Sequence, residues 1–123
     1  VLNVDRVSNH EVFVAITDVL CLPSYREGFG TIVIDAAALG VPTIGSNIVG
    51  LVDSIENQKT GILFPVGDIE QFTEAMLSFL KNPTQLKTMG LAARERVERY
   101  FSADKLYAEL KYLYFELATG LKH

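Results

Sequence analysis

Several classes of protein are excluded by what this sequence has little of. The chain contains one cysteine, so no disulfide can form within it, and Cys21 lies in an apolar run where we expect a small buried residue and a reducing compartment. Only 11 residues are Lys or Arg, and the formal net charge is −4. Such a chain lacks the basic surface that nucleic acids and acidic membranes attract. No apolar run approaches the roughly 18 residues of a spanning helix. The sequence therefore predicts no nucleic-acid partner and no transmembrane segment.

Metal-binding patterns are also missing from the sequence. No Cys and His cluster has the spacing of metal ligands, and no Asp-x-Asp pair occurs to hold a divalent ion, so we predict no metal site. The chain has 123 residues, of which 49% are hydrophobic, as is typical of one globular domain with a core. Because it opens on Val1 without a methionine, we expect a piece of a longer protein.

Short apolar runs alternate with helical patterns, and this alternation is typical of βαβ units that form a parallel sheet. The predicted strands cover residues 1–4, 18–22, 42–45 and 61–64. Residues 28–40 are predicted to be helical although residues 31–34 are a β-branched run, because parallel strands need a crossover connection. A short helix capped by Ser8 or Asn9 is expected to place Val12 and Ile16 against the sheet.

The second half of the chain is predicted to be helical throughout. Asp68 begins one helix, Asn82 and Pro83 fit the N-cap and first position of the next, and Ser102 caps the last. The arginines near residue 96 alternate with glutamates and indicate a mixed-charge surface. The last helix carries apolar residues on more than one face and is expected to pack against something beyond the domain. These residues form an apolar stripe and an aromatic group: Leu106, Tyr107, Leu110, Tyr112, Leu113, Tyr114, Phe115 and Leu117.

The predicted fold class is α/β, with a Rossmann-like parallel sheet, flanking helices and an α-helical C-terminal tail. Residues 1–67 would form the βαβ core and residues 68–123 the C-terminal helices of a single domain. The informative segment is residues 23–30, placed where a parallel strand ends and a helix begins, which is the edge at which open α/β sheets bind ligands. Glycines there let a ligand approach the backbone, and the free amides of residues 29–32 predict an anion site.

Two carboxylates accompany this turn. Glu27 lies in the turn and Asp35 on the following helix, so both could bind sugar or ribose hydroxyls at the two ends of a diphosphate. Simpler interpretations stay open: the Glu-Gly pair is a plain turn, and Asp35 is a structural acceptor bonded to a loop amide. Arg26 is either a solvated surface charge or a phosphate contact.

Three segments together resemble a known family. They are residues 18–30, reading Asp-Val-Leu-Cys-Leu-Pro-Ser-Tyr-Arg-Glu-Gly-Phe-Gly, residues 36–42, reading Ala-Ala-Ala-Leu-Gly-Val-Pro, and residues 60–63, reading Thr-Gly-Ile-Leu. They resemble the C-terminal, donor-binding domain of family 4 glycosyltransferases, which have the GT-B fold. The resemblance implies that Glu27 is the catalytic-site residue that contacts and stabilises the donor sugar. Asp35 stands where the family has a second Glu, which binds the nucleotide ribose, and its side chain is one methylene shorter.

The same resemblance assigns main-chain roles to the turn. It implies that the backbone of Gly28, Phe29 and Gly30 contacts the sugar and that the amides of Thr31 and Ile32 face the diphosphate. The loop of residues 46–53 resembles a family segment that ends in an acid, here Asp53; a plain loop is the alternative.

The activity implied is transfer of a hexosyl or N-acetylhexosaminyl group, with retained anomeric configuration, from a nucleoside-diphosphate sugar to a hydroxyl of a glycan or lipid-linked acceptor. UDP-sugar is the favoured donor and GDP-sugar the alternative, with no other cofactor. The resemblance implies that the family's N-terminal acceptor domain precedes this chain, which alone should be inactive. Residues 26–31 and 44–46 resemble those of family members that build bacterial capsule, lipopolysaccharide or other lipid-linked glycans. This resemblance implies a cytoplasmic location, peripheral at the inner face of the plasma membrane.

Two other functions remain compatible with the residues. One is a nucleotide-sugar epimerase on the same architecture, and the other is a non-catalytic sugar-nucleotide-binding domain, which the Asp35 replacement favours. Fold alone does not separate them, since this architecture supports many activities.

Overall fold

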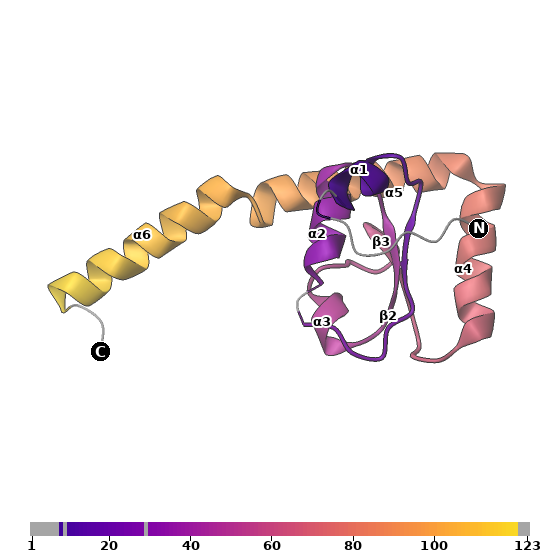
Figure 1. Ribbon diagram of the computed structural model, residues 1–123, viewed down its shortest axis with the longest axis horizontal. Helices are drawn as coiled ribbons and strands as arrows, with labels where there is room; N and C mark the ends of the chain where they lie inside the picture. The colour runs from indigo at the N-terminus through magenta and orange to yellow at the C-terminus, as the bar shows by residue number, and fades with distance from the viewer. Residues whose placement is uncertain (1–7, 9, 29, 121–123) are drawn as a thin grey trace.

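A three-stranded parallel sheet forms the centre of the protein. The computed structural model describes residues 8, 10–28 and 30–120 (Figure 1). Strands β1 (Leu20–Leu22), β2 (Thr43–Ser46) and β3 (Gly61–Phe64) lie side by side in that order. These strands fall within or next to three of the predicted ranges, which confirms the α/β class. The strand predicted at residues 1–4 lies outside the described residues.

The connections between the strands are helical, as a parallel sheet requires. Helix α2 (Thr31–Ala38) joins β1 to β2, and the short helix α3 (Val49–Val52) lies between β2 and β3. The helix predicted within residues 28–40 is confirmed, so the crossover requirement outweighs the strand preference of its β-branched start. Helix α3 falls in the segment whose alternative interpretation was a plain loop.

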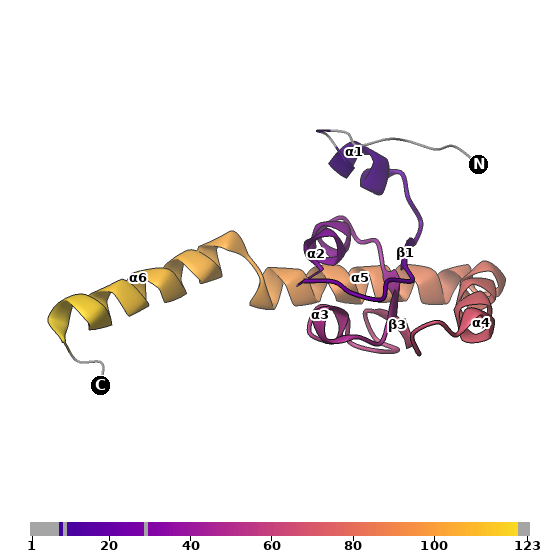
Figure 2. The same ribbon diagram turned by 60° about the horizontal axis from the view of Figure 1, so that its bottom comes forward.

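Helices cover both faces of the sheet. On one face lie α4 (Ile69–Lys81) and the first part of α5 (Pro83–Tyr100), and on the other lie α2 and α3 (Figure 2). The first core cluster contains Ile44, Ile62, Phe64, Ala75, Phe79 and Met89, and the second contains Val33, Leu51 and Ile55. Farther along, α5 packs on α2 through Ala93 and Ala37. A single long helix thus contacts elements from both faces.

Each predicted helix start in the second half is confirmed by a side-chain cap. The side chain of Asp68 accepts a hydrogen bond from the Gln71 amide at 3.0 Å, and that of Asn82 accepts one from Gln85 at 3.1 Å. Ser102 caps α6 (Ala103–Thr119) at 3.3 Å. These caps satisfy amides that a helix leaves without partners in its first turn.

The prediction for the first helix is wrong in its buried face. Helix α1 spans His10–Ala15, but Val12 is 54% exposed and Ile16 80% exposed. Val14 is buried instead, against Ala36 and Val41. Residues 12–16 are all apolar, so the sequence contains no polar position that would distinguish the face, and packing against α2 selects Val14. The cap position before His10 lies outside the described residues.

Helix α6 extends away from the sheet and its covering helices (Figures 1 and 2). It leaves large apolar side chains exposed, among them Leu110, Tyr112, Leu113, Tyr114, Phe115 and Leu117. The side chains of Leu106 and Tyr107 are outside the described part. Packing of this helix against something beyond the domain therefore stays a prediction. Within the described ranges, no helix combines the length and apolar character needed to cross a membrane.

Cys21 lies on the middle of β1 and is half-buried rather than fully buried. It packs against the core cluster formed by Ile44 and its neighbours. Burial raises the pKa of its thiol, because the thiolate loses hydration there.

Two adjacent residues of α4 test this packing. Phe79 is 4% exposed within the core, whereas Leu80 is 75% exposed. We expect Phe79→Ala to lower the free energy of unfolding by about 3–5 kcal/mol, because it removes a buried ring and leaves a cavity. The matched control Leu80→Ala should change it by less than about 0.5 kcal/mol. Urea unfolding followed by circular dichroism measures both, and equal losses would contradict the assignment of the buried face.

Candidate functional site

The turn from β1 to α2 is held by a glycine in a left-handed conformation. Gly30 has φ 72° and ψ 48° and occupies the N-cap of α2. A Cβ at this position would lie 2.9 Å from Leu51 Cδ2. Both the backbone angle and the close neighbour therefore require glycine. Without a side chain at the cap, no side-chain hydrogen bond covers the start of α2.

Helix α3 packs directly on the backbone of this turn. A Cβ on Gly50 would lie 2.3 Å from the carbonyl oxygens of Glu27 and Gly28, so only glycine allows the contact. Gly28 differs from both other glycines, because a Cβ built on it would meet nothing within 4 Å. Internal packing therefore does not require a glycine at residue 28. The missing side chain leaves open space beside the turn.

Glu27 is half-buried and its carboxylate is oriented by a neighbour. Ser24 Oγ donates a hydrogen bond to Glu27 Oε1 at 2.8 Å. Glu27 also lines an open cavity of about 470 Å³ at the carboxyl end of the strands. The other lining residues are Tyr25, Arg26, Asn47, Ile48, Val49 and Gly50. The structure thus places a fixed carboxylate beside a cavity, and brings Arg26 to the same cavity.

The first turn of α2 follows this Glu27–Gly28 turn closely in the chain. Thr31 is exposed, Ile32 is half-buried, and no acidic residue occurs in the first turn. The first amides of a helix have no acceptor within the helix, and the helix dipole adds positive potential there. This end of α2 is therefore suited to a phosphate group. Phe29 lies outside the described residues.

The two other predicted acids lie away from the cavity. Asp35 is half-buried on α2 and has an interaction partner within the protein, which keeps the interpretation as a structural acceptor open. Asp53 ends α3 as its C-cap and is exposed, and its carbonyl oxygen accepts a hydrogen bond from Arg96 Nη2 at 3.0 Å. Neither residue lines the cavity that Glu27 lines.

Three contributors to the site were missed by the sequence analysis. Ser24 precedes Glu27 by three residues, a spacing typical of turn hydrogen bonds, so a local signal for it existed. Gly50 and Arg96 have no such signal, because their partners lie more than twenty residues away in the chain. The mixed-charge surface is confirmed in part: Arg94 and Arg99 pair with glutamates one helical turn away. Across the described ranges, no group of three or more potential metal ligands comes together.

Comparison with known proteins identifies the family. The family model described as glycosyl transferases group 1 matches residues 2–96. This chain belongs to that family. Among curated glycosyltransferases of similar sequence, the capsular polysaccharide biosynthesis glycosyltransferase CapM of Staphylococcus aureus is 33% identical over 114 residues, which is 93% of this chain and 30% of that protein. N-acetyl-alpha-D-glucosaminyl L-malate synthase of Bacillus anthracis is 31% identical over 123 residues, covering 100% of this chain and 32% of the relative.

Solved structures support the same assignment. Sucrose-phosphate synthase from Thermosynechococcus elongatus has a TM-score of 0.84 and 32% identity, over 89% of this chain and 27% of that one. The Anabaena HepE protein in complex with UDP has a TM-score of 0.81 at 16% identity, over 85% of this chain and 29% of its own, and shows the fold alone. The fold is therefore that of the GT-B glycosyltransferases. The chain spans about 30% of the length of the relatives that it matches.

Two glycines of this glycosyltransferase domain, Gly50 and Gly28, allow a matched test. Gly50→Ala is expected to destabilise the domain by about 2 kcal/mol or more, because its methyl group would overlap two carbonyl oxygens. Gly28→Ala should leave the free energy of unfolding unchanged to within about 0.5 kcal/mol, or raise it slightly by restricting the unfolded chain. Thermal unfolding of the two variants measures the difference. A loss in Gly28→Ala as large as that in Gly50→Ala would contradict the open space beside the turn.

Proposed function

We propose that this chain is the nucleotide-sugar-binding domain of a retaining glycosyltransferase, which transfers a sugar to a hydroxyl of a glycan or lipid-linked acceptor. The observation that carries the proposal is the combination at one edge of the sheet. Glu27 is oriented by Ser24 beside an open cavity, and Gly28 leaves its backbone accessible. Membership of the glycosyl transferases group 1 family supports the proposal.

The diphosphate would lie at the start of α2. Gly30 puts no capping side chain on the start of this helix, and the amides of Thr31 and Ile32 would donate to phosphate oxygens. A nearby acid in the helix would oppose this binding, and the first turn has none. Arg26, which lines the same cavity, would add a positive charge.

The sugar would lie against Gly28 and the carboxylate of Glu27. Ser24 bonds to Oε1 of this carboxylate, so Oε2 would accept from sugar hydroxyls. A charge held in position in this way stabilises a developing positive charge at the sugar without reorganising during the reaction. Glu27 would thus act as an electrostatic and positioning group and not as a covalent nucleophile. Asp35 would bind the ribose if its carboxylate, one methylene shorter than that of the family's Glu, reaches the ribose hydroxyls.

UDP is the proposed nucleotide. One Anabaena HepE structure contains UDP and glucose, and another contains UDP-glucose. A structure of a TarM mutant contains UDP. The donor sugar would be a hexose or an N-acetylhexosamine, in agreement with the name of the Bacillus anthracis relative. The CapM name agrees with a role in bacterial polysaccharide synthesis. We place the complete enzyme, with an N-terminal acceptor domain, at the cytoplasmic face of the membrane.

The test is a titration of the isotope-labelled chain with UDP, UDP-glucose, UDP-N-acetylglucosamine and the corresponding GDP compounds. We expect saturable shifts of the Gly28, Gly30, Thr31 and Ile32 amides with UDP compounds. In Glu27→Gln, affinity for the UDP-sugar should fall about tenfold, because a hydrogen bond to a charged group is lost. Affinity for UDP alone should stay unchanged.

Glu109→Gln is the matched control, since Glu109 is exposed on α6. It should bind every ligand as the wild type does. If no UDP or GDP compound shifts these amides at millimolar concentration, the proposed donor site of this chain is wrong. An equal loss of UDP and UDP-sugar affinity in Glu27→Gln would contradict the assignment of Glu27 to the sugar.

A further inference from the structure

Helix α3 is held at both of its ends. At its start, the backbone of Gly50 packs on the carbonyl oxygens of Glu27 and Gly28. At its end, the carbonyl oxygen of Asp53 accepts the hydrogen bond from Arg96 Nη2 at 3.0 Å. The helix is only four residues long, so these two contacts are separated by a single turn of backbone.

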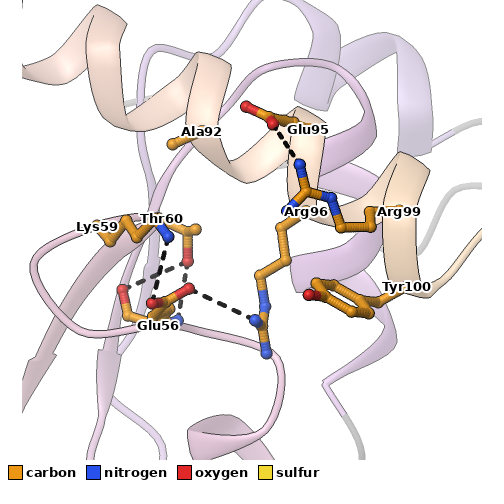
Figure 3. A pocket seen from close by; sticks show the side chains of 8 residues that line it. All are labelled: Glu56, Lys59, Thr60, Ala92, Glu95, Arg96, Arg99 and Tyr100. Carbon is orange, nitrogen blue, oxygen red and sulfur yellow. Dashed lines mark hydrogen bonds and ion pairs between the residues drawn. The ribbon is translucent and has the colours of Figure 1, made fainter.

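Arg96 makes its second polar contact to the segment that follows α3. Its Nη1 lies 3.5 Å from Glu56 Oε2, and Glu56 begins a turn closed by Thr60, whose Oγ1 accepts from the Glu56 amide at 2.8 Å. Figure 3 shows the Arg96 guanidinium between the Glu56 carboxylate and the Tyr100 ring. These residues line a cavity of about 270 Å³. The guanidinium thus holds both the end of α3 and the start of the next segment.

The opposite side of the same guanidinium contacts the junction between α5 and α6. Arg96 Cζ lies 5.6 Å from the centre of the Tyr100 ring and 5.8 Å from that of Phe101, distances at which cation–π attraction operates. Lys105, in the first turn of α6, lies 5.2 Å from the Tyr100 ring and donates to the Arg99 carbonyl oxygen at 3.2 Å. The start of α6 is therefore held to the end of α5 by contacts around the Tyr100 ring.

We propose that Arg96 is a positioning residue. It connects α3, which packs on the Glu27–Gly28 turn, to the start of α6. It fixes the end of α3 through its hydrogen bond to Asp53, the next segment through Glu56, and the direction of α6 through the rings of Tyr100 and Phe101. The Glu27–Gly28 turn and the terminal helix therefore keep one relative orientation. The importance of this orientation for donor binding rests on the proposed function, whereas the mechanical connection does not.

The chemistry of arginine explains why this residue type is needed. The guanidinium donates to Asp53 and Glu56 while its Cζ lies over two aromatic rings, a combination that a lysine ammonium does not reproduce. The Arg96 side chain is 26% exposed, compared with 58% for Arg94. Its Nε is buried and makes no hydrogen bond within the described part of the chain. Neighbouring residues therefore surround most of the Arg96 side chain, whereas more than half of the Arg94 side chain lies in solvent.

The experiment compares Arg96→Ala and Arg96→Met with the control Arg94→Ala, which removes an arginine paired only along the helix. Amide spectra of the labelled chain, recorded well below each unfolding midpoint, report on the turn. We expect shifted Gly28 and Gly50 amides in both Arg96 variants and unshifted ones in Arg94→Ala. Unshifted Gly28 and Gly50 amides in both folded Arg96 variants would overturn the proposal.

A second measurement follows the direction of α6. Spin labels at Glu74→Cys on α4 and Lys111→Cys on α6, in a Cys21→Ala background, give a distance distribution between the helices. We expect it to broaden most in Arg96→Ala and less in Arg96→Met, whose side chain still packs on the rings. A distribution as narrow in Arg96→Ala as in the wild type would overturn the proposal even if the variant is less stable.

Donor binding supplies the third readout, with UDP-glucose as the probe. We expect its dissociation constant to rise about fivefold in Arg96→Ala and to stay unchanged in Arg94→Ala. Equal constants in wild type and Arg96→Ala would overturn the link to the Glu27–Gly28 turn. Absence of UDP-glucose binding to the wild type would instead contradict the proposed function, and the two ligand-free measurements would then decide alone.

Discussion

The contact between Gly50 and the backbone of the Glu27–Gly28 turn is the constraint on which the site depends. Two carbonyl oxygens occupy the volume of a Cβ at residue 50, so α3 and the turn meet backbone to backbone. This contact holds the turn on the side of α3, while the space next to the Gly28 Cα stays open. Glu27, whose carboxylate accepts a hydrogen bond from Ser24, lines the cavity beside this turn. This edge of the sheet thus uses one glycine, Gly50, for packing and another, Gly28, that leaves space open.

Local rules and strand topology account for what the sequence predicted correctly. The caps Asp68, Asn82 and Ser102 act on amides three residues away, so their signal lies within a few positions. The helix after Gly30 was predicted against the preference of its own residues, because two parallel strands leave no other connection. The location of Glu27 and Gly28 followed from the same topology, since the carboxyl ends of parallel strands share one edge.

The features that the sequence analysis missed depend on contacts between distant segments. Val14 is buried because α2 lies beside it, and nothing in the apolar run around it distinguishes that face. Arg96 belongs to an alternating Arg and Glu pattern that predicts a solvated surface, yet its partner Asp53 is forty-three residues away in the chain. Gly50 reads as an ordinary loop glycine until the turn is packed against it. In each case one neighbour changes the role of a residue, and sequence periodicity does not record that neighbour.

Helix α5 explains how so small a domain holds its site in place. Its first part packs on the same face of the sheet as α4, its middle packs on α2 through Ala93 and Ala37, and Arg96 reaches the end of α3. Helices α2 and α3 are the two elements that flank the Glu27–Gly28 turn, and α5 contacts both of them away from the strands' carboxyl ends. Val33 of α2 and Leu51 of α3 pack on the sheet in one core cluster, and the contacts with α5 add to this packing. Because α5 also leads into α6, the element that fixes the site is the one that carries the exposed terminal helix.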